Sequence, residues 1–128
     1  MSLAHLTLAT RNVVRTAAFF TESFGWTHGE VPANSPVEVL WLEIGRGQQI
    51  HVIDVPDFVP SAFENEFGRH VAVFHPLADF PALKDRLLAR GAVMVPEIRS
   101  TPFERFFFRE PINGYLFEVV DDRRQSKD

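Results

Sequence analysis

Three histidines and one glutamate occupy matched places in the two halves of this chain. His5 corresponds to His70 and His51 to Glu118, at nearly the same spacing along the sequence. All four lie in segments where apolar and polar side chains alternate, which is typical of strands. Imidazole and carboxylate groups bind zinc, nickel, manganese and ferrous iron. The pattern therefore predicts a pseudo-two-fold site for a divalent metal ion whose identity stays open.

A smaller set within these four residues would be enough for catalysis. His5, His70 and Glu118 alone form a two-histidine, one-carboxylate set that leaves coordination positions open for substrate. Such a metal polarises a bound oxygen or produces hydroxide near neutral pH, and Glu118 is the candidate catalytic residue. A single strand histidine is more often a surface or hydrogen-bonded residue than a ligand, as expected for His28 and His75. Only the matched positions favour a metal.

The strands that carry these residues are expected to belong to two modules of the same order. Each module, at roughly residues 1–55 and 68–122, reads strand, helix, strand, strand, strand. The helices are predicted to run from Asn12 to Gly25 and from Asp79 to Gly91. The strands are predicted at 3–9, 26–31, 37–44, 48–55, 69–75, 93–98, 104–110 and 115–120. The expected fold is α+β: one domain over 1–128, with an open, barrel-like mixed sheet around a cleft and the helices outside.

Two connecting segments complete this prediction. Residues 56–67 are expected to link the modules, pinned onto the body by Phe58, Phe63 and Phe67, with a lid over a pocket as the alternative. The Asn113-Gly114 pair predicts the reversal between the last two strands. The charged residues 121–128 are expected to fray.

Composition excludes several classes of function. The 128 residues are 45% hydrophobic, with a net charge of −4 and no basic stripe. Nucleic-acid and anionic-membrane partners are therefore not expected, because both require clustered Lys and Arg. The absence of cysteine excludes a thiol nucleophile and thiolate metal ligands. Neither a signal peptide nor a long apolar run is evident, and a cytoplasmic protein is expected.

Three sequence motifs together resemble one family. His5-Leu6-Thr7-Leu8 resembles its opening strand, Phe19–Trp26 its first helix end, and Glu110–Glu118 its closing strand. The chain thereby resembles the glyoxalase/bleomycin resistance protein/dioxygenase (vicinal oxygen chelate) superfamily along nearly its whole length. The resemblance implies a homodimer that binds a divalent metal through His5, His70 and Glu118, in some members also through the position of His51. Glyoxalase I typically has Glu at that position, and the closing turn is longer here by about one residue.

The resemblance and the strand pattern also suggest residues that bind substrate. The motif around Thr7 is similar to that of fosfomycin-resistance thiol transferases, whose Thr helps to activate the antibiotic, but their phosphonate-binding Lys, Ser and Tyr set has no match here. Arg105 could bind an anionic group through its two parallel N–H donors, or simply lie on an exposed sheet face. Phe107 is expected in the core or in a pocket wall. Either Glu38 or Glu43 could act as general base, with a solvent-facing carboxylate as the alternative.

Two classes of function remain open from the sequence. The first is a divalent-metal-dependent lyase, isomerase or dioxygenase acting on a small substrate that chelates the metal through neighbouring oxygens. The alternative is a metal-free protein that sequesters a small molecule, as bleomycin-resistance proteins do, and a degenerate member kept as an interaction domain is the third reading. Because all four ligand positions are filled, the sequence favours the enzyme.

Overall fold

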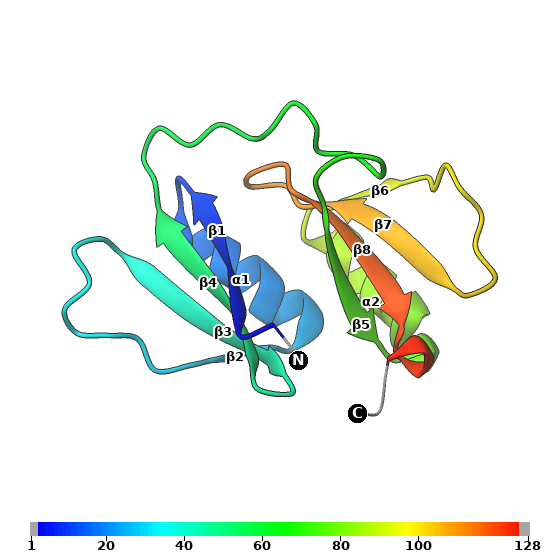
Figure 1. Cartoon of the computed structure of the whole chain (residues 1–128), viewed down its shortest axis with the longest axis horizontal. Coiled ribbons are helices and arrows are strands. Elements are labelled where there is room, and N and C mark those ends of the chain that lie inside the picture. The colour runs from blue at the N-terminus through cyan, green and yellow to red at the C-terminus, as the bar shows by residue number, and fades with distance from the viewer. Residues whose placement is uncertain (1–2, 126–128) are drawn as a thin grey trace. The chain divides into compact units, whose positions relative to one another are not determined.

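The computed structural model describes residues 3–125 and divides the chain into two compact units, with the boundary between Val59 and Pro60. Each unit contains one four-stranded mixed sheet and one long helix. These elements are labelled in Figure 1. The strand order is β1-β4-β3-β2 in the first sheet and β5-β8-β7-β6 in the second. The first and last strands of each unit pair in parallel and the other neighbours pair antiparallel. The predicted α+β class and the repeated βαβββ order are thus confirmed.

The first unit closely follows the alternation of its sequence. Its elements are β1 (His5–Thr10), α1 (Val13–Phe24), β2 (Thr27–His28), β3 (Val39–Gly45) and β4 (Gln48–Asp54). One face of the sheet is apolar and packs against α1. The buried apolar side chains are Leu8, Val13, Ala17, Phe19, Phe20, Leu42, Ile50 and Val52. The polar side chains on the opposite sheet face are therefore left for other contacts.

Helix α1 begins and ends at the predicted residues. The Asn12 side chain accepts a hydrogen bond from the backbone N–H of Arg15 at 3.0 Å, which satisfies one of the free donors of the first turn. At the other end Gly25 has a φ of 75°, a left-handed conformation that glycine adopts without steric cost. Short local signals thus fix where the helix lies on the sheet.

The second unit repeats the order with two short 3-10 helices added. Its elements are β5 (Val71–His75), η1 (Leu77–Asp79), α2 (Phe80–Ala89), β6 (Val93–Val95), β7 (Arg105–Arg109), β8 (Leu116–Asp121) and η2 (Asp122–Arg124). Every residue of β8 is buried. The predicted C-terminal tail is in part wrong, because Asp121 belongs to this strand and η2 follows it. Residues 126–128, also predicted to fray, lie outside the described residues.

The start of α2 differs from its prediction in one respect. Asp79 precedes the helix, but its carboxylate makes no capping bond. It instead accepts hydrogen bonds from His75 Nε2 at 2.7 Å and from Arg86 Nη2 at 2.6 Å. His75, expected to have no role, therefore connects the end of β5 to α2. The helix also ends earlier than predicted, at Ala89 rather than at Gly91.

The Asp79 cluster makes the second unit sensitive to acid. Hydrogen bonds from Arg86 and from His75 lower the pKa of Asp79 from 3.8 to about 2. A carboxyl group whose pKa is lowered by folding contributes stability above its unfolded pKa, and this contribution is lost as the pH falls from about 4 to 2. We expect Asp79→Asn to remove this part of the acid dependence, measured by urea unfolding between pH 2 and 7. A pH profile of the variant parallel to that of the wild type would contradict the assignment.

Carboxylates help to hold the segment that was expected to link the modules. Phe63 and Phe67 are 71% and 69% exposed, so these two rings do not pin the segment as predicted, whereas Phe58 is half-buried. Glu64 instead accepts hydrogen bonds from the backbone N–H of Leu116 and from Arg69, at 2.9 and 2.8 Å. The buried Glu64 carboxylate therefore connects this segment to β8.

Candidate metal and substrate site

In the first unit, two of the predicted ligands stack on each other. The imidazole rings of His5 and His51 lie with centroids 3.8 Å apart and planes 13° from parallel. The indole of Trp41 covers the other face of His51, at 4.0 Å and 3°. Trp41 on β3 and His51 on β4 are cross-strand partners, which explains why their rings are in contact. His51 is thus held between two aromatic rings.

One ring nitrogen of His51 is engaged by a chain of polar side chains. His51 Nε2 lies 2.8 Å from Gln49 Oε1, and Gln49 Nε2 donates to Glu43 Oε1 at 2.6 Å. Glu43 and Gln49 are cross-strand partners, so the β3–β4 register brings them together. Burial, and then the neighbouring His5, lower the pKa of His51, while the Glu43 charge opposes the shift. The ring is therefore favoured in its neutral form, which is the form that binds a metal.

This environment gives a measurable titration. We expect His51 to titrate below the ordinary value of 6.5, and His5→Ala to raise its pKa only in part, because burial has the larger effect. Because the unfolded chain then binds the proton first, the contribution of His51 to stability falls as the pH drops below 6.5. The check is an NMR titration of the histidine ring protons in both proteins. A His51 pKa at or above 6.5 in the wild type would contradict it.

In the second unit, the other two predicted ligands form a direct pair. His70 Nε2 lies 3.2 Å from Glu118 Oε1, and the two side chains are 22% and 10% exposed. Glu118 is in β8, and His70 immediately precedes β5, the strand that pairs with it. His70 Nδ1 is buried and has no hydrogen-bond partner in the structure. An unsatisfied buried polar atom of this kind costs about 1–3 kcal/mol.

A second cation, Arg105, holds the other oxygen of Glu118. Arg105 Nη1 donates to Glu118 Oε2 at 3.0 Å, while Nε donates to Glu97 at 3.0 Å and Nη2 to Glu66 at 3.3 Å. Its side chain is 3% exposed. Burial alone lowers the pKa of Arg105, but the hydrogen bonds to Glu118 and Glu97 outweigh it and raise the pKa. One guanidinium among three carboxylates leaves a net negative charge beside His70.

The remaining predicted residues fall into two groups. Phe107 is 1% exposed and its ring lies under the Arg105 guanidinium at 4.9 Å and edge-on to His70 at 5.5 Å. It is thus a buried support for the pair, as its core interpretation predicted. Thr7 is exposed on β1 and pairs in register with His51. The expected roles of Arg105, Phe107 and Thr7 in substrate binding stay predictions.

The residues present fit a divalent metal in their chemistry but not as a complete set within one unit. The N···O separation of 3.2 Å in the His70–Glu118 pair is near the spacing of two ligands on one metal, about 3 Å for bonds of about 2.1 Å. The net negative charge of the three carboxylates around Arg105 also favours a cation. Among residues 3–125, no unit gathers three His, Asp or Glu side chains closely enough to hold a metal ion. Each unit supplies two of the four predicted ligands.

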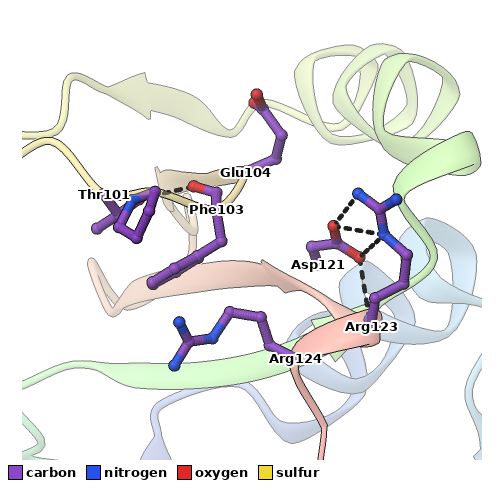
Figure 2. A pocket seen from close by; sticks show the side chains of 7 residues that line it. Thr101, Phe103, Glu104, Asp121, Arg123 and Arg124 are labelled. Atoms are coloured by element: carbon purple, nitrogen blue, oxygen red, sulfur yellow. Dashed lines mark hydrogen bonds and ion pairs between the residues drawn. The ribbon is translucent and has the colours of Figure 1, made fainter.

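A separate hollow opens elsewhere on the second unit, as Figure 2 shows. Its volume is about 480 Å³ and its lining residues are Thr101, Pro102, Phe103, Glu104, Asp121, Arg123 and Arg124. Arg123 is paired with Asp121, and the Arg124 guanidinium lies 3.8 Å from the centroid of the Phe103 ring. None of the predicted site residues lines it. The hollow is therefore distinct from the candidate site.

The sequence patterns missed the residues that support the candidate ligands. Glu66 and Glu97 lie in loops, and no periodic signal places them near Arg105. Gln49 and Glu43 could be assigned to one sheet face by alternation, but their hydrogen bond depends on the β3–β4 register. Register is set by the Gly45–Gly47 turn and by a bulge between Glu43 and Gly45. The sequence predicts the strands but not this detail.

The family that the motifs resemble is confirmed by a direct comparison. The model of the Glyoxalase/Bleomycin resistance protein/Dioxygenase superfamily matches residues 2–119. The chain belongs to this superfamily. No curated protein matches it significantly.

Solved structures of the same fold include fosfomycin resistance proteins. A mutant of the fosfomycin resistance protein FosX from Listeria monocytogenes, in complex with Mn(II) and dihydroxypropylphosphonic acid, has a TM-score of 0.78 at 20% identity, with 94% of this chain and 91% of that chain covered. FosX from Mesorhizobium loti gives 0.72 at 20% identity, covering 93% and 90%. A protein assigned to the glyoxalase family from Bacillus anthracis gives 0.75 at 20% identity, covering 94% of both chains. At these identities the likeness establishes the fold.

In the part of this chain that the structure describes, no helix is long and apolar enough to cross a membrane.

Proposed function

We propose that this protein is a divalent-metal-dependent enzyme of the vicinal oxygen chelate type, and that His5, His70 and Glu118, with His51, hold the metal. The observation that carries the proposal is the His70–Glu118 pair, whose Nε2···Oε1 separation of 3.2 Å is near that of two ligands on one metal, together with the net negative charge around Arg105. A metal bound there would supply a Lewis acid that polarises a substrate oxygen. His5 and His51 belong to the first unit, and His70 and Glu118 to the second.

The chain's own residues then have distinct tasks. Arg105 holds one Glu118 oxygen in place and leaves the other toward His70. The buried Phe107 ring packs against the Arg105 guanidinium and the His70 imidazole and shields both from water. Thr7, which is exposed and pairs in register with His51, would donate a hydrogen bond to substrate. The substrate class that suits this set is a small molecule with neighbouring oxygens, as in lyase, isomerase or dioxygenase reactions.

The relatives of known structure support the metal and the substrate class. FosX of Listeria monocytogenes has been seen with Mn(II) and with a small dihydroxy phosphonate. Fosfomycin itself is a weaker candidate substrate here, because the three residues between Arg105 and Arg109 on β7 are buried phenylalanines rather than polar groups. The open sheets, with edge strands β1 and β2 or β5 and β6, favour a homodimer that covers some of these edges.

The test is the metal content of protein purified without a metal-affinity column, measured by mass spectrometry after incubation with manganese, iron, nickel or zinc. We expect about one ion per chain in the wild type and its loss in His70→Ala and Glu118→Gln. His28→Ala is the matched control, because His28 is exposed on β2 and outside the predicted ligand set. Urea unfolding of each variant shows that it is folded. Equal metal content in the wild type and both ligand variants would refute the metal site.

One observation favours the metal-free alternative. One oxygen of the Glu118 carboxylate already accepts a hydrogen bond from Arg105, and the other lies within hydrogen-bond distance of His70. The charge of Glu118 is therefore balanced without a metal. In that case the protein would sequester a small molecule, as bleomycin-resistance proteins do. Absence of bound metal, together with saturable binding of a small aromatic or cationic compound by calorimetry, would favour this function.

A further inference from the structure

His51 is fixed in its orientation on three sides. His5 and Trp41 cover the two faces of its ring, at 3.8 and 4.0 Å between centroids. Gln49 Oε1 lies 2.8 Å from its Nε2 atom. A half-turn flip of the ring would keep both stacking contacts but would place a carbon atom in place of Nε2 opposite Gln49, so the hydrogen bond selects this orientation. The ring therefore offers a single free nitrogen, Nδ1, in a set direction.

The protonation state of the two ring nitrogens follows from the partner of Gln49. The Glu43 carboxylate can only accept hydrogen bonds, so the amide nitrogen of Gln49 must face it, as the 2.6 Å contact requires. The amide oxygen of Gln49 then faces His51, and an amide oxygen can only accept. Nε2 of His51 must therefore carry the proton. In the neutral ring, Nδ1 is left with the lone pair.

A glycine provides the room for this chain of hydrogen bonds. A Cβ atom added at Gly29 would lie 2.8 Å from Glu43 Oε1 and 3.3 Å from Gln49 Nε2. The backbone of Gly29 is held there by its N–H, which donates to the Trp41 carbonyl at 2.7 Å. The segment after β2 thus packs directly on the Glu43–Gln49 contact. Any side chain at this position would push the two polar groups apart.

We propose that Glu43 and Gln49 are positioning residues that fix His51 in the Nε2–H tautomer, so that it presents the Nδ1 lone pair to the bound ligand. The use of that lone pair for a metal rests on the proposed function, whereas the tautomer does not. Glu43 acts through Gln49 and touches neither His51 nor the ligand. This assignment gives it a task other than that of a general base.

The tautomer is measured directly by NMR on the full chain. Long-range ¹⁵N–¹H correlation spectra at pH 8 distinguish a protonated ring nitrogen from one with a lone pair. We expect a single Nε2–H tautomer for His51 in the wild type. In Glu43→Gln the new amide can donate or accept, so the Gln49 amide can turn over and both tautomers of His51 appear. Glu38→Gln is the matched control, an exposed carboxylate near the start of β3 whose loss changes the charge equally.

A second variant tests the same point without changing any hydrogen-bonding group. Gly29→Ala displaces the flexible end of Glu43 and is expected to give the same mixture, while the chain still folds. An Nδ1–H tautomer in the wild type would overturn the proposal. So would a single Nε2–H tautomer retained in both Glu43→Gln and Gly29→Ala.

Addition of Zn²⁺ separates this inference from the proposed function. If zinc shifts the Nδ1 resonance of His51 in the wild type, the lone pair serves the metal, as we expect. If the tautomer is as stated and zinc leaves Nδ1 unchanged, the positioning role of Glu43 and Gln49 stands. The role of His51 as a metal ligand then fails.

Discussion

Replacing Glu110 by alanine is expected to lower the free energy of unfolding by about 3 kcal/mol or more. The Glu110 side chain is buried, with the residue 1% exposed, at the start of the turn between β7 and β8. Its carboxylate accepts the backbone N–H groups of Ile112 at 2.8 Å, Asn113 at 2.9 Å and Tyr115 at 3.3 Å. Without it, these donors lose their partner, and the last two are buried. Urea unfolding at pH 7 measures the change.

The control for this variant is Glu104→Ala. Glu104 lies just before β7 and Glu110 just after it, but Glu104 is exposed. Its removal is expected to change the free energy of unfolding by no more than about 0.5 kcal/mol, as for most surface substitutions. Equal effects of the two substitutions would mean that the turn is held by its backbone alone.

Acid should affect Glu110 in the opposite sense to Asp79. Burial raises the pKa of Glu110, and the three backbone donors only partly oppose this shift. Because the folded state then holds the proton more tightly, this residue lowers stability as the pH rises from its unfolded pKa through its folded one. In Glu110→Gln this dependence is absent. The difference between the unfolding free energies of the wild type and Glu110→Gln should therefore change as the pH rises above 4.5, the ordinary pKa of the group, which is above the range in which Asp79 titrates.

The difference between Glu110 and the helix caps shows what the sequence could predict. Asn12 and Gly25 act on neighbours within a turn of chain, so residue type alone locates them. The reversal at Gly114 was visible from its Asn-Gly pair, but the carboxylate that holds the turn was not. Glutamate is rarely buried in proteins, so residue type alone does not predict a buried Glu110. Its role depends on which backbone N–H groups the turn directs inward.

The candidate site divides in the same way. Alternation and the internal repeat predicted that His70 and Glu118 face one another, and the structure brings them within 3.2 Å. Repeat symmetry also relates His5 and His51 to His70 and Glu118, and the structure brings this second pair together too, here as two stacked rings. The stack depends on the register of three strands, and the Arg105 cluster depends on loops. Neither is encoded in a local pattern.

Replacing Arg105 by methionine is expected to cost about 3 kcal/mol of unfolding free energy. The substitution keeps much of the side-chain volume but leaves Glu66 and Glu118, with side chains 7% and 10% exposed, without their counter-charge. Removal of one partner from a buried ion pair is costly because the remaining charge stays desolvated. The matched control is Arg109→Met on the same strand, since Arg109 donates only to backbone carbonyls and its loss leaves no carboxylate unpaired.

A double-mutant cycle shows whether the cost of this substitution lies in the contact with Glu118. Glu118→Gln should destabilise the wild type but should cost less, or stabilise, in the Arg105→Met background, because the charge it removes is then the unpaired one. The expected coupling is about 1–3 kcal/mol, against about zero for the cycle of Glu118 with Arg109. Additive effects in the Arg105 cycle would place its contribution in Glu66 and Glu97 instead. The position of Glu118 would then be set by His70 and the strand register alone.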